Sequence, residues 1–139
     1  FTPWYAALRA MMPPAPPLPA PETIPAPASW PGSDDLDDWR LLPRDPDWST
    51  GFAAWKPGEK GARAALRAFL DQGINDYARA RDFPAAPGTS RLSPHLHFGE
   101  ISPATVWHAA EGRGAGAAAF LRELGWRDYG TNLVDQFPD

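Results

Sequence analysis

The chain lacks cysteine altogether, so disulfide bonds and thiolate metal sites are excluded over its 139 residues. A protein without cysteine is typical of a reducing compartment. Long apolar runs are lacking as well: no stretch approaches the roughly 18 residues that a membrane-spanning helix needs, and none resembles a secretory signal. We therefore expect a cytoplasmic protein that does not associate with a membrane.

The chain also lacks an excess of positive charge. Asp and Glu number 17 against 13 Lys and Arg, which gives a formal net charge of -4. This balance argues against a globally basic nucleic-acid-binding protein. It is compatible with a local basic patch, because affinity for phosphate depends on where the arginines gather.

Patterns for metal binding and for nucleophilic catalysis are missing. His95 and His97 lie two residues apart, so on a helix they point to opposite sides and cannot share a metal. The acidic stretch at 33–38 lacks the glycine and the final glutamate of a calcium-binding loop. No serine lies in a GxSxG elbow. The sequence therefore predicts no metal site and no catalytic side chain.

Alternation of apolar and polar residues, the mark of a strand, is not convincing anywhere, so the sequence predicts an all-α fold. The clearest helix starts at Gly58, where apolar residues recur with helical spacing. Further helices are expected over 74–81, from Ser102-Pro103 onward, and over 117–134. Ser followed by Pro favours a helix start, because Ser caps the free amides and Pro fits the first turn.

Proline is abundant but unevenly placed, with ten of the 18 prolines in the first 31 residues. Residues 13–31 are expected to form polyproline II or irregular chain, either as a stiff linker or as a ligand for a proline-binding module. We predict a Pro-rich linker with a Trp-rich irregular segment over 1–57 and a helical domain over 58–139. The abrupt start and end lead us to expect a fragment of a longer protein.

The stretch TSRLSPHLHFGEISP, residues 89–103, concentrates chemistry-bearing side chains. Thr89, Ser90 and Ser93 place hydroxyls beside Arg91, and Ser93 is followed by proline. As an N-cap, Ser93 would start a short helix whose free amides point back at these groups, which is the composition of an anion site. The alternative is a helix cap with local hydrogen bonds only.

A second group of residues lies in FLRELGWRDYG, residues 120–130. Phe120, Glu123 and Arg127 fall on roughly one helical face, with Trp126 at its edge. Such a face could bind a heterocycle by ring stacking and by hydrogen bonds to ring edges. The alternative is a plain Glu123–Arg127 salt bridge between residues four apart.

A third group lies in DYARARDFP, residues 76–84, where Tyr77 and Arg81 are four residues apart. On a helix they share a face and could reach one ligand. The alternative is an ordinary pair on a helix surface.

In this order and spacing, YARARDFP, GTSRLSPHLHFGEISP and FLRELGWRDY resemble the flavin-binding helical domain of the DNA photolyase/cryptochrome family, most closely a cyclobutane pyrimidine dimer photolyase. The resemblance extends upstream to FTPWYAAL. It implies an all-α FAD-binding domain, of which this chain would be the N-terminal half. It also implies a deoxyribodipyrimidine photo-lyase, a carbon-carbon lyase that repairs DNA in light by electron transfer from reduced FAD. The fragment alone is expected to be inactive.

The resemblance implies roles for individual residues on the cofactor side. The FAD phosphates would be held by Thr89, Ser90, Arg91, Leu92 and Ser93. Tyr77 and Phe120 would make further flavin contacts, and Arg127 would lie between the flavin and the substrate. The cofactor supplies the reactivity and the protein positions it, which agrees with the lack of a nucleophile motif.

On the substrate side, the resemblance implies DNA containing pyrimidine dimers as the partner of a monomeric enzyme. Arg81 would meet a DNA phosphate, Trp126 would stack on a dimer flipped out of the duplex, and Glu123 would bond to a base edge. A second, antenna chromophore would bind a preceding domain absent from this chain. The electron-relay tryptophans would lie in the absent second half. The remaining alternatives are a cryptochrome-type blue-light photoreceptor and a helical protein-binding module that uses the Pro-rich arm.

Overall fold

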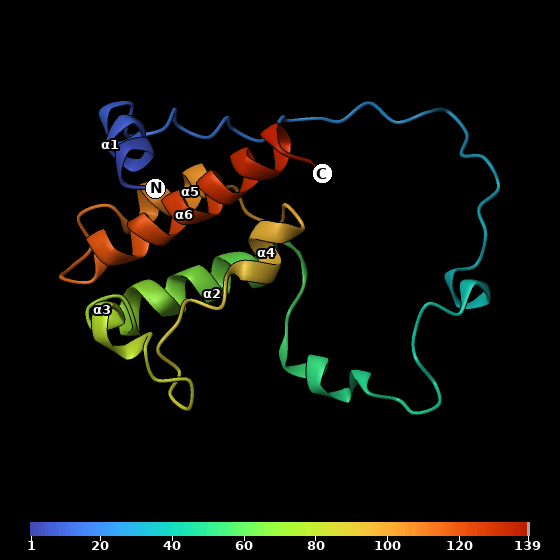
Figure 1. Cartoon of the computed structure of the whole chain (residues 1–139). Helices are drawn as coiled ribbons and strands as arrows, with labels where there is room; N and C mark the ends of the chain where they lie inside the picture. The colour runs from blue at the N-terminus through green and yellow to red at the C-terminus, as the bar shows by residue number, and fades with distance from the viewer. Residues whose placement is uncertain (139) are drawn as a thin grey trace. The chain divides into compact units, whose positions relative to one another are not determined.

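The computed structural model describes residues 1–138, and over this range it contains helices, turns and irregular segments but no strand. The all-α fold expected from the sequence is therefore confirmed. The chain separates into two compact units (Figure 1). The first, here called the helical unit, comprises Phe1–Pro17 and Pro57–Asp139; the second, the Trp-rich unit, comprises Leu18–Lys56. The predicted division of the chain at residue 57 into family domains stays a prediction.

The helical unit is built around its longest helix, α6. Helices α1, α3 and α5 pack against α6, while α2 packs against α4 and α5. Figure 1 shows α6 running beside α5 and α1, with α2 next to α4. The bounds are Thr2–Ala10 for α1, Gly58–Gln72 for α2, Tyr77–Ala80 for α3, Ser93–His97 for α4, Pro103–Ala110 for α5 and Ala117–Gln136 for α6.

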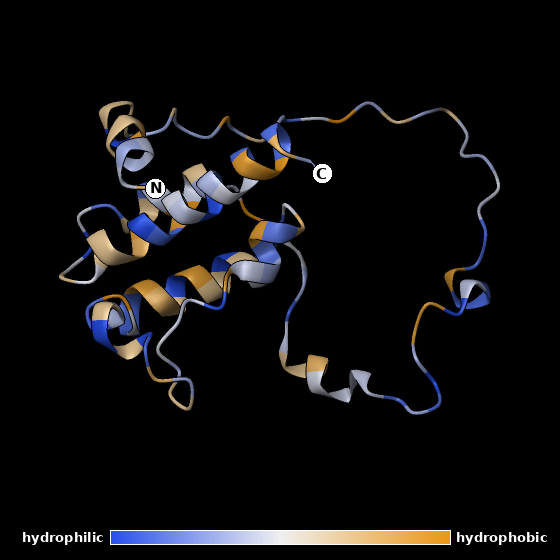
Figure 2. Ribbon diagram, viewed as in Figure 1, coloured by the Kyte–Doolittle hydropathy of each residue, from blue (hydrophilic) through white to orange (hydrophobic). Residues whose placement is uncertain are grey.

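The core of the helical unit starts from the amphipathic pattern of α2. Ala62, Leu66 and Phe69 are buried on one face of that helix, and Figure 2 shows apolar and polar segments alternating along it. The Phe69 ring meets Tyr77 of α3 and Phe120 of α6, with ring centroids 5.5 and 4.7 Å away. Burying a large apolar side chain stabilises a fold by about 1.5–3 kcal/mol, so this aromatic cluster fixes how three helices meet.

One glycine allows α1 to approach α6 closely. A Cβ atom on Gly125, in the middle of α6, would lie 2.8 Å from Cε2 of Tyr5 on α1. Real Cβ atoms do not come so close to other atoms, so the packing of these helices requires glycine at this position.

The Trp-rich unit contains two short 3₁₀ helices, η1 (Leu36–Trp39) and η2 (Ser49–Ala54). Side chains order both locally: the Asp35 carboxylate accepts a hydrogen bond from the amide of Asp37 at 3.0 Å, and Asp47 accepts one from the amide of Ser49 at 2.9 Å. No residue of 18–56 is buried. This unit is therefore held by local hydrogen bonds rather than by an apolar core.

The helix starts predicted from the two Ser-Pro pairs differ in outcome. Ser102 caps α5, because its Oγ accepts a hydrogen bond from the amide of Thr105 at 3.0 Å, which confirms the prediction. The prediction that Ser93 caps a helix is wrong: Leu92 is the N-cap of α4, and Ser93 is already helical. The reason is the left-handed backbone of Arg91, with φ of 54°, which turns the chain into the helix early.

The helix expected over 74–81 is shorter than predicted. Regular α-helix spans only Tyr77–Ala80, and residues 73–76 form a turn. This turn inserts Ile74 into the core, where it is almost completely buried. None of the helices over residues 1–138 combines the length and the apolar character needed to cross a membrane.

Candidate functional site

A surface pocket of about 540 Å³ lies where α1, the end of α3 and α6 meet. We call it the Arg81 pocket. It brings together the three residues that the resemblance assigned to substrate binding: Arg81 from the end of α3, and Glu123 and Trp126 from α6. Its lining consists of Phe1, Thr2, Tyr5, Arg81, Arg122, Glu123 and Trp126.

An ion pair crosses this pocket from α3 to α6. The guanidinium of Arg81 pairs with the carboxylate of Glu123, and each side chain is about one-third exposed, at 32% and 29%. The guanidinium also lies over the ring of Tyr77, 5.6 Å from its centroid. The hydrogen bond with Glu123 raises the pKa of Arg81 above its usual value.

The salt bridge between Glu123 and Arg127, left open by the sequence, is not what the structure shows. Glu123 turns to Arg81 instead. Arg127 donates a hydrogen bond to the backbone carbonyl of Leu96 at 3.2 Å. Arg127 therefore ties α6 to α4, and it does not line the Arg81 pocket.

The indole of Trp126 forms the aromatic wall of the Arg81 pocket. Phe1 stacks on it with ring centroids 3.4 Å apart and planes inclined by 8°, and Tyr129 meets it edge-on at 5.9 Å. Trp126 is still 45% exposed. One face of the indole is thus covered by Phe1, while much of the ring remains accessible.

A second hollow, here called the Thr89 groove, has a volume of about 370 Å³ and lies between α2 and the loop before α4. Thr89, Ser90 and Arg91 line it from the loop, Phe69 lines it from α2, and Gly73 lines it from the turn that follows α2. Two hydroxyls and one guanidinium on one wall provide hydrogen-bond donors suited to an anion.

The next two residues, Leu92 and Ser93, do not belong to this wall of the groove. Leu92 is only 1% exposed, so its side chain anchors the loop in the core. Its amide donates a hydrogen bond to Oγ of Ser90 at 3.4 Å. Ser93 is exposed at the start of α4 and does not line the groove.

Tyr77 and Phe120 lie in the core, their rings edge-on at 5.3 Å. Burial raises the pKa of the Tyr77 phenol above its usual range. Phe69 contacts both rings and also lines the Thr89 groove, while Tyr77 lies under the Arg81 guanidinium. A continuous series of packed side chains therefore connects the groove to the Arg81 pocket.

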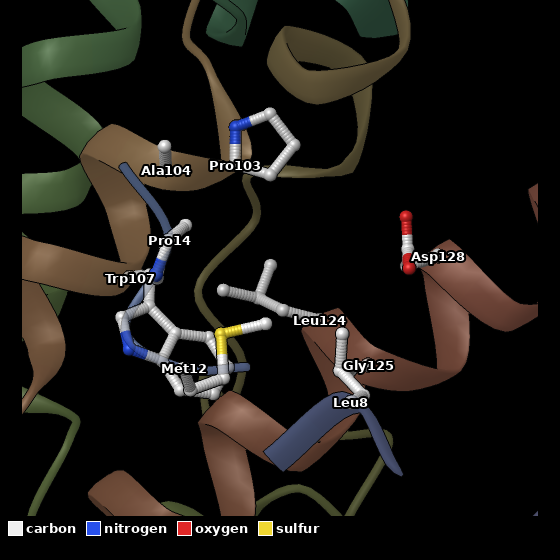
Figure 3. A pocket seen from close by; sticks show the side chains of 9 residues that line it. All are labelled: Leu8, Met12, Pro14, Pro103, Ala104, Trp107, Leu124, Gly125 and Asp128. Atoms are coloured by element: carbon white, nitrogen blue, oxygen red, sulfur yellow. The ribbon is translucent and has the colours of Figure 1, made fainter. Parts of the chain in front are cut away.

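Figure 3 shows a third cavity, of about 270 Å³, with Met12, Trp107 and Leu124 around it and Asp128 on α6. Its lining is mostly apolar and includes no basic side chain. The segment after α1 closes one side, held by a 2.9 Å hydrogen bond between Nε2 of His108 and the carbonyl of Pro14. This cavity belongs to the packing of that segment rather than to a polar site.

The stretch at 89–103 contains a hydrogen-bonded pair, His95 and Glu100, that the sequence patterns did not predict. His95 is 4% exposed, and its Nδ1 lies 2.5 Å from the Glu100 carboxylate. The hydrogen bond from His95, followed by one from the amide of Gly58, lowers the pKa of Glu100. The only sequence signal is the spacing of His95 and Glu100. Residues five apart come together only where a helix ends between them, as α4 does at His97.

Comparison with known proteins shows extensive similarity. No family model matches the chain. The chain is 43% identical to the deoxyribodipyrimidine photo-lyase of Agrobacterium fabrum over 100% of its own length, and 37% identical to that of Thermus thermophilus over 99%. A solved class III photolyase from Agrobacterium tumefaciens superposes on 99% of the chain with a TM-score of 0.91 and 44% identity.

This chain belongs to the DNA photolyase/cryptochrome family. It spans 30% of the length of each of these three relatives. The part of the photolyase that it matches is helical, as the resemblance implied. Within this chain, the Arg81 pocket unites residues from α1, the end of α3 and α6, and Phe69 of the aromatic cluster lines the Thr89 groove.

Proposed function

We propose that this chain is part of a deoxyribodipyrimidine photo-lyase, which splits cyclobutane pyrimidine dimers in DNA with light and reduced FAD. The main support is the Arg81 pocket, where an ion pair and an accessible indole meet in one hollow. The chain is similar along its whole length to photo-lyases but spans 30% of them, so the activity is proposed for the complete protein.

The Thr89 groove supports FAD as the cofactor. FAD carries two phosphates, and Thr89, Ser90 and Arg91 offer hydroxyl and guanidinium donors on the wall of the groove. The amide of Leu92 donates to Oγ of Ser90 and so orders this loop, and Ser93 follows at the exposed start of α4. We propose these five residues as the phosphate cradle. Bound flavin would supply the electron.

The aromatic residues behind the groove support the rest of the cofactor site. Tyr77 and Phe120 pack on Phe69, which itself lines the groove. Tyr77 and Phe120 would pack behind the flavin and hold it next to the substrate pocket. Arg127 donates a hydrogen bond to the Leu96 carbonyl. It would lie between the flavin and the substrate and fix α6 relative to α4.

In the Arg81 pocket, Trp126 would stack on a flipped pyrimidine and Glu123 would accept a hydrogen bond from a pyrimidine N–H. An ionised carboxylate only accepts hydrogen bonds, so it selects a base edge that donates. Enzymes that act on a base inside a duplex take it out of the stack. No side chain is needed as a nucleophile in this scheme, and we propose a monomeric, cytoplasmic enzyme.

A chimera tests this function. In the Agrobacterium fabrum photo-lyase, the segment matched by this chain is replaced by the chain itself, and the purified protein is assayed for bound FAD and for thymine-dimer repair in blue light. We expect FAD retention and light-dependent repair. Trp126→Ala should retain FAD and lose repair, whereas Arg67→Gln, an exposed change on α2, should leave both unchanged.

Two outcomes would overturn the proposal. A chimera that binds FAD and is photoreduced, but does not repair dimers, would support a photoreceptor of the cryptochrome type. A folded chimera without FAD would contradict the cofactor site. Arg91→Ala separates the two sites, because it should lower FAD content without altering the Arg81 pocket.

A further inference from the structure

The loop that lines the Thr89 groove runs directly into α4, and the pair of His95 and Glu100 spans the other end of that helix. We infer that this pair positions the phosphate cradle: it fixes α4 against α2, and α4 in turn fixes the backbone of the loop that precedes it. The inference rests on the proposed function and deepens it. Neither the motifs nor the resemblance gave His95 or Glu100 a role.

Helix α4 is too short to hold itself in place. It spans only five residues, Ser93–His97, and isolated helices shorter than about 12–15 residues are marginal in water. Its position therefore depends on contacts with the rest of the helical unit. The buried Leu92 side chain anchors its start, and Arg127 of α6 donates to the Leu96 carbonyl at 3.2 Å. Helix α4 also packs against α2, beside which it lies in Figure 1.

The pair ties the end of α4 to the first residue of α2. Gly99 has a positive φ of 70°, which reverses the chain after the helix, so that the amide of Glu100 donates to the carbonyl of His95 at 2.8 Å. This turn brings the Glu100 carboxylate to within 2.5 Å of Nδ1 of His95. The same carboxylate accepts a hydrogen bond from the amide of Gly58, where α2 begins. One carboxylate therefore joins α4 to α2.

This join is shielded from water. His95 is buried, and the side chain of Glu100 is only 20% exposed. Hydrogen bonds to an ionised group are stronger than those between neutral groups, and shielding from water strengthens them further. An exposed pair on a helix surface would contribute little in comparison. The pair of His95 and Glu100 is therefore placed to keep α4 in one position.

The phosphate cradle needs a fixed helix after it because its backbone is strained. Arg91 has a left-handed φ of 54°, which a residue with a side chain keeps only where its surroundings enforce it. The next residue, Leu92, belongs to the first turn of α4, since its carbonyl accepts a hydrogen bond from the amide of Leu96 at 2.9 Å. A shift of α4 would therefore move Arg91 and the hydroxyls beside it. Donors that are held in place before binding retain a ligand better, because less ordering is needed.

Release of FAD from the chimera described above tests this role. The variants are His95→Leu, Glu100→Ala, the double variant, and His95→Asn, whose side-chain amide can replace Nδ1 as a donor. Ser102→Ala, which removes the cap of α5, is the control for a loss of stability elsewhere in the helical unit. The rate of FAD release is followed by flavin fluorescence, and the free energy of unfolding is measured in urea. Because Glu100 is the more exposed partner, its variant serves alone if His95→Leu does not fold.

We expect His95→Leu and Glu100→Ala each to release FAD on the order of tenfold faster than the unmodified chimera, as for a lost hydrogen bond to a charged group. The double variant should release FAD no faster than Glu100→Ala alone, because both changes remove the same join. His95→Asn should restore slow release in part. Ser102→Ala should be less stable but release FAD at the unmodified rate, and repair per bound FAD should be the same in all variants.

Unchanged release in both His95→Leu and Glu100→Ala would overturn the inference. Release that rises with lost stability in every variant, Ser102→Ala included, would also overturn it, because the pair would then act only through the stability of the fold. Failure of the unmodified chimera to bind FAD would instead contradict the cofactor site of the proposed function, so the two failures can be told apart.

Discussion

At the scale of single residues, the chemistry of the Arg81 pocket depends on Glu123. Its carboxylate is partly shielded and lies beside the guanidinium of Arg81, which holds it in one place. Hydrogen bonds that involve a charged group contribute about 1.5–3 kcal/mol, more than those between neutral groups. In the proposed function, such an acceptor beside an indole would bind the hydrogen-bond-donating edge of a flipped pyrimidine.

The first prediction concerns this acceptor. Glu123→Gln keeps the shape of the side chain but removes the negative charge that pairs with Arg81. We expect the chimera to retain FAD while its preference for damaged over undamaged DNA falls by roughly tenfold or more, as expected for the loss of a charged hydrogen bond. Competition binding with the two duplexes measures this, and an unchanged preference would contradict the role given to Glu123.

The second prediction concerns Glu100. The hydrogen bonds from His95 and from the Gly58 amide lower its pKa in the folded chain. Its stabilising effect is therefore complete above its unfolded pKa, about 4.3, and is lost as the pH falls through the lower folded value. We expect Glu100→Gln to be less stable than the parent at neutral pH and to lose less stability on acidification.

Urea unfolding at neutral and acid pH measures this difference. Glu22→Gln, which changes an exposed carboxylate in the Trp-rich unit, is the matched control and should follow the parent. Equal pH dependence of the parent and Glu100→Gln would show that the His95–Glu100 pair does not stabilise the fold.

At the scale of elements, the two Ser-Pro helix starts show that the same dipeptide can act in two ways. Before α5, Ser102 has an extended backbone and its hydroxyl is free to cap the helix. Before α4, Leu92 has already taken helical angles, so Ser93 is inside the helix. A cap requires the non-helical backbone as well as the hydroxyl.

The third prediction uses this contrast. Ser102→Ala removes the hydrogen bond to the Thr105 amide and should lower the free energy of unfolding by about 1 kcal/mol, as is usual for a lost N-cap. Ser93→Ala removes no cap and should change the free energy of unfolding by less than about 0.5 kcal/mol. Chemical denaturation of the two variants compares them, and equal losses would contradict the assignment.

At the scale of the whole molecule, the two units differ in how they are stabilised. The helical unit encloses every buried residue of the chain over 1–138, whereas the Trp-rich unit has none. Local hydrogen bonds alone give a segment little protection against opening. The two units should therefore open independently.

The fourth prediction follows from this difference. Trypsin should cut after Arg40 and Arg44, in the Trp-rich unit, well before it cuts after Arg67 in the middle of α2. Mass spectrometry of a digestion time course identifies the first fragments. Early cleavage at Arg67 would mean that the helical unit is less stable than its buried core indicates.

The success of sequence reasoning also varied with scale. The apolar spacing from Gly58 predicted α2, because a helix that packs on a core must present a stripe. The partner of Glu123 could not be predicted in the same way. Its near neighbour Arg127 has the right spacing, but the choice of Arg81 depends on how α3 packs against α6. Similarly, the positive φ of Arg91 has no local sequence signal, and it moved the start of α4.

Gly125 has a consequence for protein engineering. In the interior of a helix, alanine is more favourable than glycine by about 1 kcal/mol. A stabilisation scheme guided by helix propensity would therefore replace Gly125 first. The added methyl would meet the Tyr5 ring, and Tyr5 forms one wall of the Arg81 pocket. A change chosen to strengthen α6 would thus force the Tyr5 ring to move, and the engineered protein would alter the shape of its pocket while gaining a better helix.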